Sequence, residues 1–146
     1  SRNSGNVWID RLRRFQSLMK ALLDTHTALF AWGARSRLSK RALQFIEAKE
    51  NQLVFSQVST IEIALKHKIG KLDLPMAPID YVLSRVQLLG FEYVTIDEMD
   101  IAVIGELPSP HRDPFDWLLL AAARRLRLPI ISCDKAFEEY PVELIW

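Results

Sequence analysis

A short apolar run that ends in an acid, Lys20-Ala-Leu-Leu-Asp24-Thr-His26, is the feature that most constrains the fold of this chain. Its three apolar residues show no alternation with polar ones, which predicts a short strand buried on both faces. Asp24 then lies at the carboxyl end of a strand in a parallel sheet, where ligands bind in open α/β folds. Asp24 could equally cap the helical pattern that begins at Ala28, so this stretch alone leaves both roles open.

Strand-like and helix-like segments alternate along the rest of the chain. The predicted strands are 21–23, 53–55, 91–96, 128–132 and 142–146. The predicted helices are 28–32, a helix capped by Ser39, 59–68, 79–89, 97–105, one from Pro114 to about Ala123, and 135–139. This alternation predicts an α/β fold with a central, mostly parallel sheet of about five strands and right-handed crossovers.

The composition indicates one globular domain of ordinary hydrophobicity. The chain has 146 residues, of which 49% are hydrophobic and 25% charged, and its net charge of +1 excludes a strongly basic protein that coats nucleic acid. Cys133 is the only cysteine, which excludes an intrachain disulfide and favours a reducing compartment. The longest apolar run, 117–123, is too short to span a bilayer, so we expect a cytoplasmic protein with no membrane partner.

The first 18 residues lack the regular pattern of the domain. They are polar at first and then carry a small arginine cluster with irregularly spaced apolar residues. We expect residues 1–18 to be an extension outside the native domain, with the domain itself spanning residues 19–146. A short helix that docks or touches nucleic acid is the alternative for this segment.

Two local patterns make specific predictions about helices. Ser59 and Glu62 stand in the S-x-x-E relation of a capping box, which predicts a helix that starts at Ser59. The helix that begins at Asp97 has four apolar side chains that we expect to be buried: Met99, Ile101, Ala102 and Ile104.

Four acids are predicted to reach the same edge of the sheet: Asp24, Glu62, Asp116 and Asp134. Each also has a purely structural explanation, since Asp and Glu are common in the first turn of a helix, and Asp113 with Pro114 makes a good start for the helix that contains Asp116. Carboxylates that gather at one place need cations to neutralise them. Oxygen ligands without His or Cys select Mg²⁺ or Mn²⁺, and the three histidines have no spacing typical of a zinc site.

Four sequence blocks together resemble the PIN-domain ribonucleases, and more closely the VapC toxins of bacterial type II toxin–antitoxin systems. The blocks are Leu22-Leu-Asp24-Thr-His26, Ser59-x-x-Glu62-Ile-Ala, His111-Arg-Asp-Pro-Phe-Asp116 and Ile130-Ile-Ser132-x-Asp134. They occur in the family's order over residues 19–146. The resemblance implies a PIN-like α/β/α sandwich.

The resemblance also implies a function and a site. Asp24, Glu62, Asp116 and Asp134 match the acids that bind Mg²⁺ or Mn²⁺ and cut RNA in that family. Asp113, Ser132 and Thr25 are secondary candidates for the same site. Trp117 departs from the family pattern, because a smaller or charged residue is common at that position, and it could affect substrate preference or packing.

Partners follow from the same resemblance: an RNA substrate, a cognate antitoxin and a second copy of the chain in a homodimer. Candidate phosphate contacts are Lys66, Lys68, Lys71, Arg112, Arg124, Arg125 and Arg127. The main alternative is a catalytically inactive PIN-like module that acts only by binding a protein or RNA. A phospho-aspartyl phosphatase fits less well, because it needs an acid two residues after the first one, where this chain has His26.

Overall fold

The central sheet is parallel throughout, as the alternation of segments predicts. The computed structural model describes residues 19–107 and 113–146, so the extension 1–18 and the candidate Arg112 lie outside the described residues. The five strands lie in the order β3-β2-β1-β4-β5. Their bounds are β1 Lys20–Leu23, β2 Gln52–Ser56, β3 Glu92–Val94, β4 Ile130–Ile131 and β5 Leu144–Ile145.

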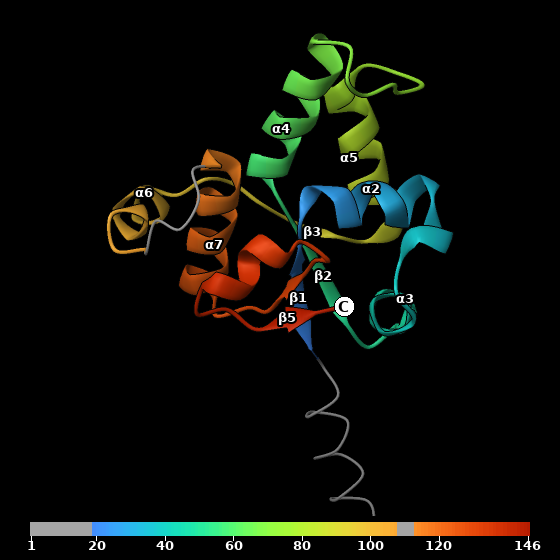
Figure 1. Cartoon of the computed structure of the whole chain (residues 1–146). Coiled ribbons are helices and arrows are strands. Elements are labelled where there is room, and N and C mark those ends of the chain that lie inside the picture. Colours follow the sequence, from blue (N-terminus) through green and yellow to red (C-terminus); the bar gives the residue numbers. More distant parts are fainter. Residues whose placement is uncertain (1–18, 108–112) are drawn as a thin grey trace, which may run out of the picture.

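Helices cover both faces of the sheet and form the expected α/β/α sandwich (Figure 1). The helices on one face are α2 (Thr25–Gly33), α3 (Lys40–Glu47) and α5 (Pro78–Leu89), with the short η1 (Arg35–Arg37) between α2 and α3. The other face carries α7 (Pro114–Leu126) and η2 (Lys135–Glu139), with α6 (Glu98–Ile104) packed on α7. Helix α4 (Gln57–Lys68) extends from the carboxyl end of β2 (Figure 1). Within the described ranges, every helix is too short or too polar to cross a membrane.

Side-chain alternation along the strands explains the apolar runs. Leu23 and Phe55 belong to the core that contains α2 and α5, whereas Leu22 and Val54 belong to the core that contains α7. The register aligns Leu22 with Val54 on one side and with Ile130 on the other, so each layer continues across neighbouring strands. Because both faces are covered, the buried positions 21–23 of β1 and 53–55 of β2 are all apolar, as predicted.

The predicted capping box at Ser59 is wrong. Helix α4 starts two residues earlier, at Gln57, and its cap is Ser56, whose hydroxyl accepts a hydrogen bond from the backbone N–H of Val58. The chain passes directly from β2 into α4, so Ser56 both ends the strand and caps the helix. Ser59 and Glu62 therefore lie inside the helix, both buried, where their side chains are directed toward α2.

The predicted burial of α6 is also wrong, because Met99, Ile101 and Ala102 are exposed and Ile104 is only half-buried. Met99 is 59% exposed and Ile101 is 62% exposed, whereas the acid between them, Asp100, is 1% exposed. Asp100 turns inward because its carboxylate pairs with Arg125 of α7, at 2.6 Å from Nε to Oδ1 and 3.2 Å from a terminal guanidinium nitrogen to Oδ2. The same carboxylate accepts the backbone N–H of Asp97 and completes a capping box there.

This ion pair anchors α6 to α7, the helix that carries Asp116. Arg125 is thus engaged within the chain, and Arg124 pairs with Glu106 at 3.3 Å. Both arginines were candidates for phosphate contacts, and Arg125 in particular has its hydrogen-bonding groups directed at a buried carboxylate. Charge-assisted, two-point pairs of this kind fix the relative position of the elements they join.

We expect Asp100→Ala to lower the free energy of unfolding by about 2–4 kcal/mol, because it leaves the partly buried Arg125 guanidinium without its partner charge. This loss is smaller than for a fully buried pair, because the Arg125 side chain is 25% exposed. Urea unfolding measures the loss. Glu92→Ala is the matched control, since it removes the exposed Lys20–Glu92 pair and should cost less than about 1 kcal/mol. Equal costs for both variants would contradict the anchoring role.

Candidate functional site

The candidate site lies where the strand order reverses. The chain proceeds from β1 to β2 and β3 on one side of the sheet and then returns to place β4 on the other side of β1. Asp24 directly follows β1 and Ser132 directly follows β4. Ligand sites of open α/β sheets form at the carboxyl ends of strands at such a reversal. The topology therefore places both residues at the expected location.

Asp24 is buried, with 5% of its surface exposed, and is bonded on both oxygens. Oδ1 accepts the backbone N–H of Thr27 at 2.8 Å, which caps α2, and Oδ2 accepts a short hydrogen bond from the Ser132 hydroxyl. Burial raises the pKa of the Asp24 carboxyl above its ordinary value because it disfavours the charged form, and the bonds from Ser132 and Thr27 only partly oppose this. Asp24 thus caps α2, and it also places a buried carboxylate at the edge of the sheet.

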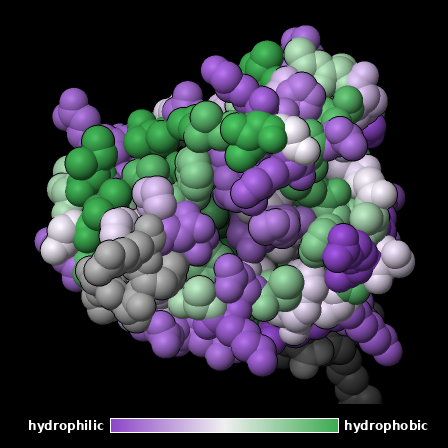
Figure 2. Space-filling view, turned by 45° about the horizontal axis from the view of Figure 1, so that its top comes forward, coloured by the Kyte–Doolittle hydropathy of each residue, from purple (hydrophilic) through white to green (hydrophobic). Residues whose placement is uncertain are grey.

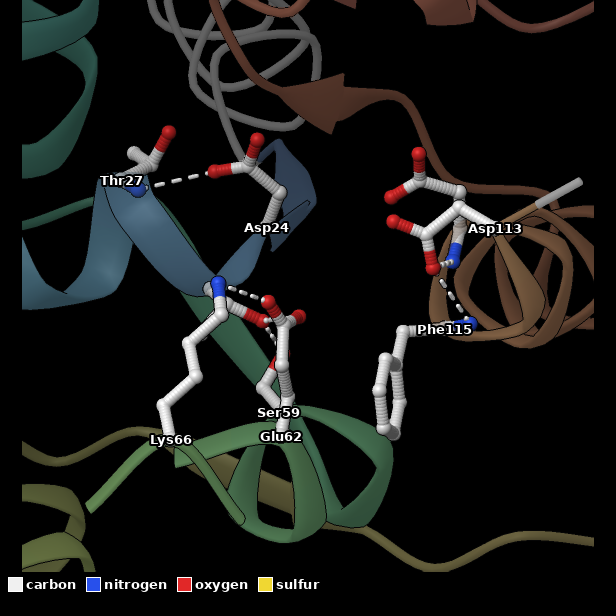
Figure 3. A network of polar contacts seen from close by, with 9 residues as sticks. Asp24, Thr27, Ser59, Glu62, Lys66, Asp113 and Phe115 are labelled. Atoms are coloured by element: carbon white, nitrogen blue, oxygen red, sulfur yellow. Dashed lines mark hydrogen bonds and ion pairs between the residues drawn. The ribbon is translucent and has the colours of Figure 1, made fainter. Parts of the chain in front are cut away.

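Glu62 is the second buried carboxylate of the site, at 8% exposure. The Thr25 hydroxyl lies 2.7 Å from Glu62 Oε1 and 2.9 Å from Ser59 Oγ. The single hydroxyl proton of Thr25 is directed at these two acceptors, the Glu62 carboxylate and the Ser59 oxygen. The other oxygen, Oε2, accepts from Lys66 Nζ at 2.5 Å (Figure 3). Thr25 immediately follows Asp24, so the residue that binds the second buried acid is the sequence neighbour of the first.

The remaining acids lie at the starts of helices. Asp134 is exposed, caps η2 through the backbone N–H of Ala136 at 2.9 Å, and donates its own N–H to Ser132 Oγ at 3.0 Å. Asp113 is exposed and caps α7, accepting from the backbone N–H of Phe115 at 2.9 Å. Asp116 is half-buried in the first turn of that helix. Figure 3 shows Asp24 and Glu62 on one side of the view and Asp113 on the other.

The candidate ligands all offer carboxylate oxygens, which suit a hard divalent cation, although the acids do not form a close group among the described residues. In residues 19–107 and 113–146, no three or more His, Cys, Asp or Glu side chains form a group that could hold a metal ion. All acids singled out from the sequence nevertheless offer oxygen donors, which Mg²⁺ and Mn²⁺ prefer. Glu62 already binds a cation, the Lys66 ammonium. Convergence of Asp24, Glu62, Asp116 and Asp134 on one ion stays a prediction.

Apolar side chains lie next to this polar site. Ile61 and Leu65 of α4, the helix of Glu62, and Ile69 at its carboxyl-terminal cap follow one another at four-residue spacing and are 40%, 48% and 64% exposed. Four-residue spacing places them on one face of the helix. In the space-filling view, hydrophilic side chains gather in the middle of the visible face, with apolar side chains along much of its upper border (Figure 2).

Two residues gain a role that the sequence did not settle. Lys66 was a candidate phosphate contact among several, and the structure places its ammonium on Glu62. Glutamate followed by lysine four residues later is a favourable helical pair, so the spacing in the sequence already indicated this contact.

Trp117 packs against the core under α7 and donates its indole N–H to the Tyr140 hydroxyl at 3.1 Å. Its departure from the family pattern therefore serves packing.

Comparison with known proteins agrees with the fold and the motifs. A family model for the PIN domain matches residues 21–143. VapBC2 from Rickettsia felis, in a crystal structure bound to a DNA fragment from its promoter, has 16% identity and a TM-score of 0.63 over 86% of this chain and 97% of that one. FitAcB from Neisseria gonorrhoeae has 18% identity and a TM-score of 0.61 over 86% of this chain and 96% of that one.

A third similar structure is a toxin–antitoxin complex from Klebsiella pneumoniae. It has 24% identity and a TM-score of 0.52 over 83% of this chain and 92% of that one. No curated protein sequence matches the chain.

We expect Asp24→Asn to be at least as stable as the wild type at neutral pH in EDTA. Asparagine keeps an oxygen for the Thr27 N–H and offers an N–H to the Ser132 oxygen, but it has no buried charge. The raised pKa means that charged Asp24 opposes folding at neutral pH and that this cost disappears as the pH falls through the raised value.

Urea unfolding at neutral and mildly acidic pH measures this difference. The advantage of Asp24→Asn should shrink toward acidic pH, where the wild-type carboxyl becomes protonated in the folded state. An asparagine variant that is less stable than the wild type at neutral pH would show that the buried charge stabilises the fold.

Proposed function

The chain belongs to the PIN domain family, and from this we propose that it is a Mg²⁺- or Mn²⁺-dependent endoribonuclease of the VapC toxin type. The observation that carries the proposal is the pair of buried carboxylates, Asp24 and Glu62, at the carboxyl edge of the sheet where the strand order reverses. Buried acids are costly to the fold, and a catalytic site is a common reason for retaining them.

The acids that would hold the cation are Asp24, Glu62, Asp116 and Asp134. When bound, such a cation supplies Lewis acidity and lowers the pKa of a coordinated water. The chain's own residues prepare the site: Ser132 and Thr27 fix the Asp24 carboxylate, and Thr25 fixes that of Glu62. The amino terminus of α7 faces the same edge, and its dipole favours the anionic phosphate of an RNA substrate.

We further propose an antitoxin as the protein partner. The exposed apolar face of α4, formed by Ile61, Leu65 and Ile69, adjoins the polar site and is a surface that a partner protein could cover. The similar solved structure from Klebsiella pneumoniae is a toxin–antitoxin complex, which supports the same arrangement here. A homodimer and a cytoplasmic location, which the single cysteine favours, complete the proposal.

A catalytically inactive binding module is the second candidate. It is favoured by the helix-capping roles of Asp24, Asp113 and Asp134, each of which accepts a backbone N–H. The open arrangement of the acids, with no metal-ready group of three among the described residues, points the same way. This candidate predicts neither metal binding nor RNA cleavage, so both proposals can be tested with the same variants.

We expect Asp116→Asn to lower RNA cleavage in Mn²⁺ by roughly a hundredfold or more, because it removes one ligand charge and keeps the side-chain shape. The wild type should gain about 2.7 kcal/mol of stability at a hundredfold excess of Mn²⁺ over Kd, a shift of several degrees in Tm, and the variant should gain less. Cleavage of a labelled RNA and thermal unfolding with and without Mn²⁺ measure the two effects.

Asp73→Asn is the matched control, since it removes the same charge from an exposed loop residue outside the site. It should cleave RNA and respond to Mn²⁺ as the wild type does. Wild-type cleavage by Asp116→Asn would remove Asp116 from the site, and a wild type that neither binds Mn²⁺ nor cleaves RNA would favour the binding module.

We expect expression of the wild-type chain to arrest bacterial growth, because an unregulated ribonuclease destroys the cell's own RNA. Asp116→Asn should permit growth at the same protein level. Co-expression of the small open reading frame adjacent to the gene should rescue growth with the wild type. Normal growth with the wild type alone would contradict the toxin proposal.

A further inference from the structure

The Lys66 side chain pairs with an acid of the candidate site, although its position on α4 leaves it partly exposed to solvent. It lies one helical turn after Glu62, and its ammonium nitrogen is 2.5 Å from Glu62 Oε2. The Lys66 side chain is 34% exposed, whereas that of Glu62 is only 11% exposed. Figure 3 shows the lysine side chain extended from the helix so that its nitrogen reaches the carboxylate. The contact therefore joins a long, partly exposed lysine to a buried acid that Thr25 also binds.

The contact matters because of where Glu62 lies. Ion pairs between exposed side chains contribute little to stability, but a buried carboxylate without a partner charge is costly. Thr25 satisfies Oε1 with a neutral hydroxyl, which supplies a hydrogen bond and no charge. The ammonium of Lys66 supplies the positive charge at Oε2.

We infer that Lys66 is an internal counter-ion that competes with the divalent cation for Glu62 and thereby lowers the affinity of the site for its metal. This inference rests on the proposed function, in which Glu62 is a metal ligand. A carboxylate oxygen that accepts an ammonium at 2.5 Å is the oxygen that a hard cation would need. The long stem of lysine and its partial exposure allow the ammonium to withdraw into solvent when the metal enters.

The inference has a direct thermodynamic consequence. Metal binding must break the Lys66–Glu62 pair, so part of the binding free energy is lost in displacing the ammonium. Removal of the lysine charge therefore strengthens metal binding, and at the same time it weakens the metal-free fold by leaving Glu62 unpaired. A lysine that merely oriented Glu62 for the metal would have the opposite effect on affinity.

The test is calorimetric titration of the folded protein with Mn²⁺ after removal of bound metal. We expect Lys66→Met to bind Mn²⁺ about tenfold more tightly than the wild type, a difference of about 1.4 kcal/mol. Lys68→Met is the matched control, because it removes the same charge from an exposed position two residues further along α4. Its Kd should remain within about twofold of the wild-type value.

Thermal unfolding supplies a second readout that does not depend on activity. Lys66→Met should melt below the wild type in EDTA and show a larger rise in Tm on addition of Mn²⁺. Lys66→Gln keeps a hydrogen-bond donor without the charge, so it should also lower the Tm in EDTA and increase the rise in Tm with Mn²⁺. It replaces the methionine variant if that one does not fold. Lys66→Arg, which keeps the charge, should bind Mn²⁺ about as weakly as the wild type.

Weaker Mn²⁺ binding by Lys66→Met, or an affinity equal to that of Lys68→Met, would overturn the inference and leave the proposed function standing. A wild-type protein that binds no Mn²⁺ would overturn the proposed function, and the inference with it. The two failures are therefore distinguished by the wild-type titration alone.

Discussion

Burial of the Asp24 carboxylate between the ends of β1 and β4 is the constraint on which the rest of the site depends. A buried charge needs hydrogen bonds from every side, and here they come from two separate segments, Ser132 after β4 and Thr27 in α2. Satisfying Asp24 thus fixes the loop after β4 and the first turn of α2 together. The fixed turn in turn directs Thr25 toward Glu62, which joins α4 to the same network.

Among the described residues, the two buried acids at this edge differ in their partner charges. Glu62 has the Lys66 ammonium, but the contacts of Asp24 are a hydroxyl and a backbone N–H, and burial raises the pKa of its carboxyl. Asp134 and Asp113 add further negative charge at helix starts nearby. In the proposed function, a divalent cation binds only the folded state and therefore stabilises it.

The sheet was predictable from the sequence because burial on both faces gives strands a distinctive apolar run, as in Ala21, Leu22 and Leu23. Helix starts were less predictable, since Ser56 and Ser59 are both good caps and only the tertiary structure selects the first. The exposure of Met99 and Ile101 was not predictable either. It follows from the pair between Asp100 and Arg125, and residues 25 positions apart give no local signal. The positions of Asp113 and Asp116 along the edge followed from topology, but the directions of their side chains did not.

The structural and functional explanations of these acids are compatible, because a carboxylate has two oxygens and capping occupies one. Asp24, Asp113 and Asp134 each cap a helix through Oδ1. In Asp24 the second oxygen binds Ser132, which shows that a capping acid can serve another element at the same time. Cap geometry therefore cannot decide whether such an acid also binds metal. Asparagine keeps the capping oxygen and loses the charge, so the response of asparagine variants to Mn²⁺ separates the two roles.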